Sequence, residues 1–171
     1  PMAGNEFKGI KYASEKIFDG ANYIITPSAK NKKANIFVLK DMILKIGFAN
    51  IIEMTPEEHD DMVAFTSHLP HIIALSLVLN PIIEKKPICT GSSFQDATRV
   101  AKLNSDLWSE LLLKNSSNVV KYLETFESNV QEFKKAILNI DEKYLKELFA
   151  KACRLKEELE LNANSRRKVK G

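Results

Sequence analysis

The strongest constraint on the fold is a change in hydrophobic pattern at residue 54. Before it, two short β-rich runs at residues 22–26 and 49–54 flank a segment whose apolar residues recur at spacings of three and four. Those residues are Ile36, Leu39, Ile43 and Ile46. The spacing places them on one face of a helix, which Gly47 is expected to end. The pattern predicts a strand, a helix and a second strand, the usual edge of an α/β sheet.

Beyond residue 54 the strand signals disappear. The segment 55–58, Thr-Pro-Glu-Glu, combines an N-cap threonine, a proline at the first helical position and a glutamate three residues after the cap. Together these features predict the start of a helix. The helix is expected to run toward Ser67, to kink or break at Pro70, which lacks a backbone donor, and to resume as far as Leu79. A loop is expected over residues 82–92.

Four further helices are expected after this loop. Ser92 or Ser93 can cap a helix that runs through Ala101, and Ser105 or Asp106 can cap a short one. The last two helices are long and carry apolar residues at alternating steps of four and three, the spacing of a coiled coil. The first seam is Val119, Leu123, Phe126, Val130, Phe133 and Ile137, and the second is Leu145, Leu148, Ala152, Leu155 and Leu159. The seams can pack together as a hairpin within one chain, or, because they leave more apolar stripe than a thin lobe can easily cover, they can form a dimer interface.

These elements predict a mainly α chain. A short β-α-β remnant of a Rossmann-type domain edge is expected at residues 1–54, followed by an all-helical domain at residues 55–171. The chain opens on proline, without an initiator methionine, and its β-α-β piece has no larger sheet to join. We therefore expect a fragment of a longer protein.

Composition argues against several classes of function. Hydrophobic residues are 44% and charged residues 27%, as in ordinary globular domains. The net charge of +3 comes largely from the C-terminal end, so no nucleic-acid partner is expected. The apolar run Ile72–Leu79 is far shorter than the roughly 20 residues of a membrane span, so no membrane partner is expected. Cys89 and Cys153 are too few for a disulfide framework and are interpreted as core residues of a cytoplasmic protein.

All three histidines lie in the predicted helix that follows Thr55. At about 100° per residue, Ser67 lies about 80° and His71 about 120° from His59, whereas His68 lies about 180° away. His59, Ser67 and His71 can therefore share one side, with His68 facing the other. Two imidazoles and a hydroxyl suit a small anionic or hydroxylated ligand. The residues alone leave an equal alternative, which is that these histidines are capped or buried core residues.

A metal site is not favoured in this segment. His68 and His71 have a chelating spacing, and His59-Asp60 is similar to the paired ligands of metal-dependent phosphohydrolases. No other histidine exists in the sequence to complete the set, and the wheel separates His59 from His68. No metal is therefore expected.

A second candidate site is the segment 91–101. Gln95 and Arg99 are one helical turn apart on one face. An arginine near the start of a short helix, after a Gly-Ser-Ser loop with free backbone donors, is suited to binding a carboxylate because the guanidinium fork matches both oxygens. The alternative is an ordinary salt bridge, for instance to Asp96 or Glu110.

Several short motifs occur in a characteristic order. They are Pro1-Met-Ala-Gly4-Asn-Glu6 with Gly9, Phe18-Asp-Gly20, Ile24-Ile-Thr26-Pro27, His59-Asp60, Ser67-His68-Leu69-Pro70-His71, Phe94, Asp96, Thr98-Arg99 and Trp108. In order and spacing, from Pro1 to about Val120, they resemble the motifs of prephenate dehydrogenases. The residues after Val120 match that family only in helical character.

This resemblance implies an NAD- or NADP-dependent oxidative decarboxylation of prephenate to 4-hydroxyphenylpyruvate in tyrosine biosynthesis. It implies that residues 1–54 end a nucleotide-binding domain. It also implies that residues 55–171 form a substrate-binding and homodimerisation domain, similar to the C-terminal domain of 6-phosphogluconate dehydrogenase. By position, Arg99 would hold a substrate carboxylate with Gln95 beside it. The other implied site residues are His71, Ser67 and His59 in the pocket, Glu6 as a polar gate and Trp108 as packing.

Two departures from the family limit what the resemblance implies. The family's catalytic histidine would immediately precede Pro1, and no Gly-x-Gly-x-x-Gly turn occurs in the 171 residues. The chain is thus expected to hold no catalytic residue and to be inactive alone. Gln95 stands where many relatives carry lysine, which leaves prephenate and arogenate both open as substrates. A non-catalytic dimerisation or small-anion-binding module is the further alternative.

Overall fold

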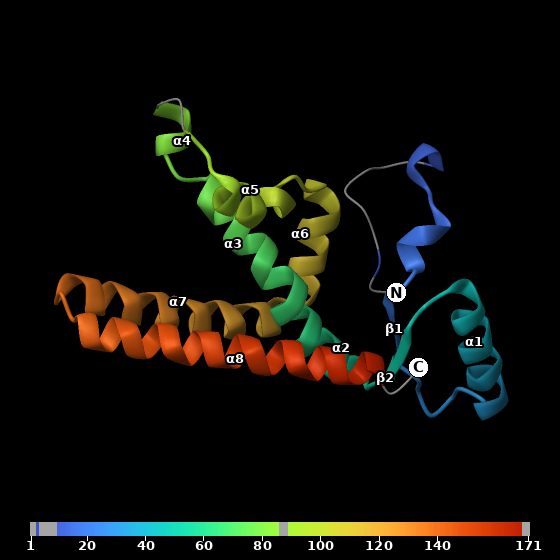
Figure 1. Cartoon of the computed structure of the whole chain (residues 1–171). Helices are drawn as coiled ribbons and strands as arrows, with labels where there is room; N and C mark the ends of the chain where they lie inside the picture. The colour runs from blue at the N-terminus through green and yellow to red at the C-terminus, as the bar shows by residue number, and fades with distance from the viewer. Residues whose placement is uncertain (1–2, 4–9, 86–88, 169–171) are drawn as a thin grey trace. The chain divides into compact units, whose positions relative to one another are not determined.

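A computed structural model describes residue 3, residues 10–85 and residues 89–168 of the chain (Figure 1). Side chains are described for the same residues except 15 and 162–168. By its internal contacts the chain divides into two compact units, Pro1–Tyr122 and Leu123–Gly171. The expected domain boundary at residue 54 remains a prediction.

The first unit begins with the expected strand, helix and strand. β1 (Asn22–Ile25) and β2 (Asn50–Glu53) pair in parallel, and α1 (Lys33–Ile46) connects them. A parallel pair needs such a crossover because the chain must return to the same end of the sheet. Gly47 ends α1 in the left-handed region at φ 111°, and its N–H donates to the carbonyl of Leu44. The prediction of this piece is confirmed, although α1 begins earlier than its apolar spacing indicated.

A small core holds this β-α-β piece together. Its buried members are Ile25, Ile43 and Phe48. The ring of Phe48 contacts Phe18 and Tyr23 at centroid distances of 5.1 and 5.0 Å. Two 3₁₀ turns, η1 (Ile10–Tyr12) and η2 (Glu15–Phe18), precede β1, and η2 carries Phe18 to this core.

The helical part of the first unit starts with one continuous helical run (Figure 1). It consists of α2 (Pro56–Val63), a π-helical turn η3 (Ala64–His68) and α3 (Leu69–Val78). The interruption expected at Pro70 is this π turn, in which the N–H of Leu69 donates to the carbonyl of Ala64. Proline lacks an N–H and its ring clashes with the carbonyl four residues earlier, and the wider turn accommodates both effects.

Three helical boundaries differ from those predicted. Residues expected to form a loop include a one-turn helix, α4 (Ile82–Lys85). The next helix, α5 (Ser92–Thr98), has Gly91 as its N-cap rather than Ser92 or Ser93, and it ends in a 3₁₀ turn, η4 (Arg99–Ala101). α6 (Ser105–Lys114) is capped by the side chain of Asn104, which accepts from the N–H of Leu107 at 3.0 Å. Asparagine caps as well as serine or aspartate, so the sequence did not distinguish neighbouring candidates.

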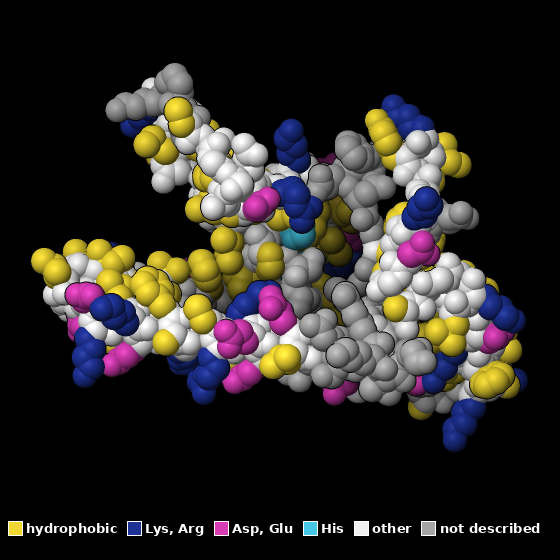
Figure 2. All heavy atoms as spheres, in the orientation of Figure 1, with side chains coloured by type: hydrophobic (Ala, Val, Ile, Leu, Met, Phe, Trp, Pro, Cys, Tyr) yellow, Lys and Arg dark blue, Asp and Glu magenta, His cyan; other side chains and the backbone are white. Residues whose placement is uncertain are grey.

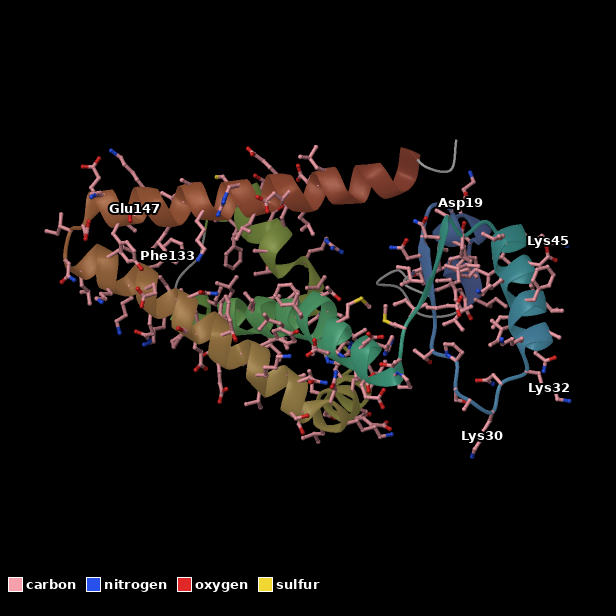
Figure 3. All side chains as sticks on the ribbon, turned by 90° about the horizontal axis from the view of Figure 1, so that it is seen from below. Asp19, Lys30, Lys32, Lys45, Phe133 and Glu147 are labelled. Carbon is pink, nitrogen blue, oxygen red and sulfur yellow. The ribbon has the colours of Figure 1, made fainter. Side chains whose placement is uncertain are left out.

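The second unit is a helical hairpin, one of the two packings that the seams allowed. It joins the later part of α7 (Ser116–Leu138) to α8 (Glu142–Lys168). The Tyr144 hydroxyl donates to Glu132 at 2.7 Å, and the rings of Phe133 and Phe149 contact at 6.0 Å. Figure 3 shows Phe133 in the space between the two helices.

The hairpin leaves part of each seam exposed in the isolated chain. Apolar side chains gather along α7 and α8 in Figure 2. The most exposed seam residues are Val130 at 45%, Ile137 at 62%, Leu155 at 49% and Leu159 at 64%. These residues form a stripe that the hairpin itself does not cover.

The expectation that both cysteines are core residues is wrong. Cys89 and Cys153 are both exposed. Cys153 lies one residue beyond the seam position Ala152, and one residue turns a helical side chain by about 100° away from the seam. Cys89 lies in the loop before α5.

The helical run Pro56–Lys85 is long and apolar enough to cross a membrane, with a mean hydropathy of 1.7 in its most apolar window. The core helix of a soluble protein meets the same criterion. The shortness of the run Ile72–Leu79 therefore does not exclude a membrane span, and the absence of a membrane partner remains a prediction.

Candidate active site

The candidate site is built on the helical run from α2 to α3. The Thr55 hydroxyl accepts from the N–H of Glu58 at 3.1 Å, and the Glu58 carboxylate accepts from the N–H of Thr55 at 2.8 Å. This reciprocal capping box fixes where the run begins. The π turn then adjusts the helical phase before α3, and such turns are frequent at functional sites.

His71 and Trp108 form the centre of the site. Their rings lie 4.0 Å apart by centroid with a tilt of 35°, so the imidazole of α3 stacks on the indole of α6. His71 Nδ1 lies 2.7 Å from the carbonyl oxygen of Ser67. Because a carbonyl can only accept, Nδ1 carries the proton, and Nε2 is left for another partner. The backbone of Ser67 thus sets both the tautomer and the orientation of His71.

His68 contacts the same tryptophan. Its ring lies 6.0 Å from Trp108 at an angle of 77°, an edge-on contact. The wheel put His68 opposite His59, but the same angles put it only about 60° from His71. Residues three apart are neighbours on a helix, so both imidazoles reach the same indole. That spacing of three was the signal in the sequence that could have placed His68 beside the site.

His68 is the one residue of this group that is buried, with an exposed fraction of 5%. Its Nδ1 has no hydrogen-bond partner among the residues that the structure describes. Burial lowers the pKa of His68 from its ordinary 6.5, the nearby His71 lowers it further, Asp60 opposes the shift and His59 adds to it. His68 is therefore neutral at neutral pH.

His59 lies on α2, the first helix of the run that carries the three histidines. Its Nδ1 is 2.9 Å from Asp60 Oδ1, and its side chain is 36% exposed. The Asn115 amide donates to the backbone carbonyl of Asp60 at 2.7 Å, which connects the junction of α6 and α7 to α2. His59 faces solvent next to a carboxylate, and no described ring contact joins it to Trp108.

A second link holds α2 against the start of α7. Asp61 accepts from Lys121 at 2.5 Å and from the Tyr122 hydroxyl at 2.8 Å. The hydrogen bond from Lys121 and then that from Tyr122 lower the pKa of Asp61, and the same pairing raises the pKa of Lys121. No feature of the sequence predicted this cluster, because its members lie about 60 positions apart.

Arg99 lies on an element that packs against the histidine-bearing helix. It is exposed and opens η4, which contacts α3, as does α5. The sequence placed Arg99 near the start of a helix with free backbone donors; instead it follows the last residue of α5. The donors at the start of α5 are therefore not beside Arg99. Figure 2 shows a histidine side chain at the surface near basic side chains, in the region of α3 and α6.

The remaining predicted site residues are placed as follows. Gln95 is exposed, and its amide donates to the Thr90 hydroxyl at 3.5 Å, within its own loop and helix. Glu110, a possible salt-bridge partner for Arg99, pairs with Lys114 at 2.5 Å. Glu6 lies outside the described residues. Among the residues with described positions, no group of three or more His, Cys, Asp or Glu could hold a metal ion.

The family follows from two adjoining matches. The model of the prephenate dehydrogenase dimerization domain matches residues 55–151, and that of the prephenate dehydrogenase nucleotide-binding domain matches residues 1–53. The chain belongs to the prephenate dehydrogenase family. The boundary between the two matches falls where the capping box of α2 begins.

Two curated relatives support this assignment. The chain is 34% identical over 157 residues to the prephenate dehydrogenase of Bacillus subtilis, which covers 87% of the chain and 40% of that protein. It is 36% identical over 155 residues to the cyclohexadienyl dehydrogenase of Zymomonas mobilis, which covers 87% of the chain and 53% of that protein. The chain thus spans about half the length of these family members.

Solved structures of the family share the fold. The structure of A. aeolicus prephenate dehydrogenase in complex with hydroxyphenyl propionate and NAD+ matches 93% of the chain and 57% of that protein, with a TM-score of 0.81 and 31% identity. The structure of Synechocystis arogenate dehydrogenase matches 93% of the chain and 59% of that protein, with a TM-score of 0.76 and 25% identity. The predicted fold class, a short β-α-β piece followed by helices, is confirmed.

Proposed function

We propose that this chain is the substrate-binding and dimerisation part of a prephenate dehydrogenase, which oxidises and decarboxylates prephenate to 4-hydroxyphenylpyruvate. The observation that carries the proposal is the stacking of His71 on Trp108, with Nε2 of the imidazole available to a ligand. The complex of the A. aeolicus relative with hydroxyphenyl propionate supports the same ligand class, a ring bearing a carboxylate chain.

Each site residue has a distinct proposed role. Arg99, on the turn that packs against α3, binds a substrate carboxylate with its guanidinium fork. Nε2 of His71 accepts a hydrogen bond from the substrate, because Nδ1 holds the imidazole proton. Trp108 provides an apolar wall for the substrate ring. Ser67, His59, Gln95 and Glu6 complete the polar lining of the pocket. None of the 171 residues is assigned as the base that accepts the hydroxyl proton.

A nicotinamide dinucleotide, NAD or NADP, is the proposed cofactor. When bound, it supplies a hydride acceptor. Residues 1–54 fit only the C-terminal end of a nucleotide-binding domain. Their strands β1 and β2 form a two-stranded sheet edge, and the 171 residues contain no phosphate-binding Gly-rich turn. We therefore assign none of the chain's own residues to the dinucleotide, and we expect the 171 residues alone to be inactive.

Two alternatives are tested by the same assay. Arogenate stays open as the substrate, since Gln95 stands where many relatives carry lysine and donates to Thr90 in the preceding loop. The Synechocystis relative is an arogenate dehydrogenase. The second alternative is a non-catalytic dimerisation or small-anion-binding module. The proposal also includes a cytoplasmic homodimer with no nucleic-acid or membrane partner.

The test is a rate assay with prephenate, arogenate and each nicotinamide, in the protein expressed with all the residues that its gene encodes. Arg99→Ala should lower kcat/KM by about 10- to 100-fold, the loss expected for a charged hydrogen bond. Lys102→Ala removes an exposed cation three residues away and should leave the rate unchanged. Turnover of arogenate alone would change the substrate, and no turnover of either would support the non-catalytic module.

A further inference from the structure

The buried imidazole of His68 has no role in the site as proposed so far. The residue is 5% exposed, and its Nδ1 has no hydrogen-bond partner among the described residues. An unpaired polar atom in the interior costs stability, and an apolar side chain of the same size would avoid that cost. Any role of His68 in the site therefore depends on the contacts of its aromatic ring, which a phenylalanine would also make.

The ring contacts of His68 indicate what it does. Trp108 comes from α6, whereas both imidazoles come from the run that carries the π turn. His71 stacks on the indole at 4.0 Å, and His68 meets it edge-on at 6.0 Å and 77°. Stacked and edge-on contacts restrict an aromatic ring in different directions. Together the two imidazoles restrict both the position and the tilt of Trp108.

The π turn supports the same interpretation. His68 is its last residue, and Pro70 follows two residues later. Ser67, whose carbonyl fixes His71, is its neighbour. The turn thus places the carbonyl of Ser67, which accepts from His71, next to the ring of His68, which contacts Trp108 edge-on. The helix that carries His71 begins directly after them.

We propose that His68 is a positioning residue: its buried ring holds Trp108 at the orientation in which His71 stacks on it. The role of this wall in binding an aromatic carboxylate rests on the proposed function, whereas the positioning itself does not. The titratable groups that act on His68 are His71, Asp60 and His59.

The first test uses the fluorescence of Trp108, the only tryptophan of the 171 residues, in the chain itself. An imidazole in ring contact, above all when protonated, quenches indole emission, so the emission of Trp108 reports its contact with the stacked His71. His71→Gln should remove most of this quenching. His68→Ala should move the emission to longer wavelength and reduce the quenching by about twofold or more, because Trp108 is no longer held against His71.

Matched variants separate positioning from general loss of structure. His68→Phe keeps a ring and should restore both signals. Ser76→Ala removes an exposed hydroxyl on the same helical run, bonded to the carbonyl of Ile72, and should leave both unchanged. If circular dichroism shows that His68→Ala does not fold, His68→Leu fills the space without an aromatic edge and carries the same expectation. Unchanged emission and quenching in the folded variant would overturn the proposal.

A second test connects positioning to the ligand. In the protein expressed with all its encoded residues and NAD+, calorimetry would measure binding of hydroxyphenyl propionate. His68→Ala should weaken binding by about 2- to 10-fold, the factor that corresponds to one aromatic pair, and His68→Phe by less than about twofold. Equal affinity in His68→Ala would overturn the role of the positioned Trp108 in ligand binding. If the unaltered protein does not bind this compound, the proposed function fails, while the fluorescence test still decides the positioning role.

Discussion

At the scale of single residues, the site combines two histidines that differ in burial and in the hydrogen bonding of Nδ1. His71 is half-buried, with its Nδ1 bonded to a backbone carbonyl and its ring against Trp108. His68 is buried beside it, without a described partner for Nδ1. His71 thus keeps Nε2 for a ligand, whereas His68 is neutral because burial lowers its pKa.

The lowered pKa of His68 predicts acid sensitivity of the folded chain. When the pH falls below the ordinary 6.5, the unfolded chain takes up a proton at His68 before the folded chain does. Protonation then favours the unfolded state, so the free energy of unfolding should fall between neutral pH and about pH 5. His68→Phe removes this proton uptake and the unpaired nitrogen. Urea unfolding at both pH values should show a smaller pH dependence in His68→Phe and at least equal stability at neutral pH.

At the scale of elements, the capping box determines where the site-bearing helix starts. Thr55→Ala removes the acceptor for the N–H of Glu58 and should lower the free energy of unfolding by about 1 kcal/mol. Ser76→Ala is a suitable control, because its hydroxyl only bonds back to the carbonyl of Ile72 within α3. Urea unfolding of both variants measures the difference. Equal stability of the two variants would contradict the importance of the cap.

The link between α2 and α7 predicts a second pH effect, at lower pH. Hydrogen bonds from Lys121 and Tyr122 lower the pKa of Asp61, so the folded state favours the carboxylate more than the unfolded state does. This contribution is present above the ordinary 3.8 and is lost as the pH falls below it. Asp61→Asn should destabilise the chain slightly at neutral pH and weaken its acid dependence. Asp41→Asn, which breaks only the pair with Lys45 inside α1, should have a smaller effect.

Local signals explain which elements the sequence could predict. The capping box at Thr55 and the stop at Gly47 depend on a few adjacent residues, and both predictions are confirmed. The sequence could not predict a π turn as such. Pro70 requires some irregularity in the helix, but the surrounding packing determines whether it is a kink, a break or a π turn. The contact of His68 with Trp108 joins two helices, and a helical wheel describes only one. The substrate roles of Arg99 and its neighbours remain predictions.

At the scale of the whole molecule, the family is described by a dimerization domain that matches residues 55–151. The isolated chain leaves large apolar side chains of the hairpin exposed, among them Val130, Ile137 and Leu159. Burial of such a stripe against a second copy would remove apolar surface from water at about 25 cal/mol per Å². The seam residues Phe126 and Leu148, in contrast, are half-buried within the chain. A charge at either of them would disturb the hairpin itself as well as any dimer.

Val130 therefore offers the cleaner test of a dimer. It is 45% exposed in the single chain, so Val130→Glu should leave the hairpin folded and place a charge in the interface between copies. Sedimentation velocity should show a dimer for the unaltered chain and a monomer, or an aggregate, for the variant. Ser128→Glu adds the same charge at an exposed polar position on the same helix and should remain dimeric. A Val130→Glu chain that sediments as the unaltered dimer would show that this part of the stripe lies outside the interface.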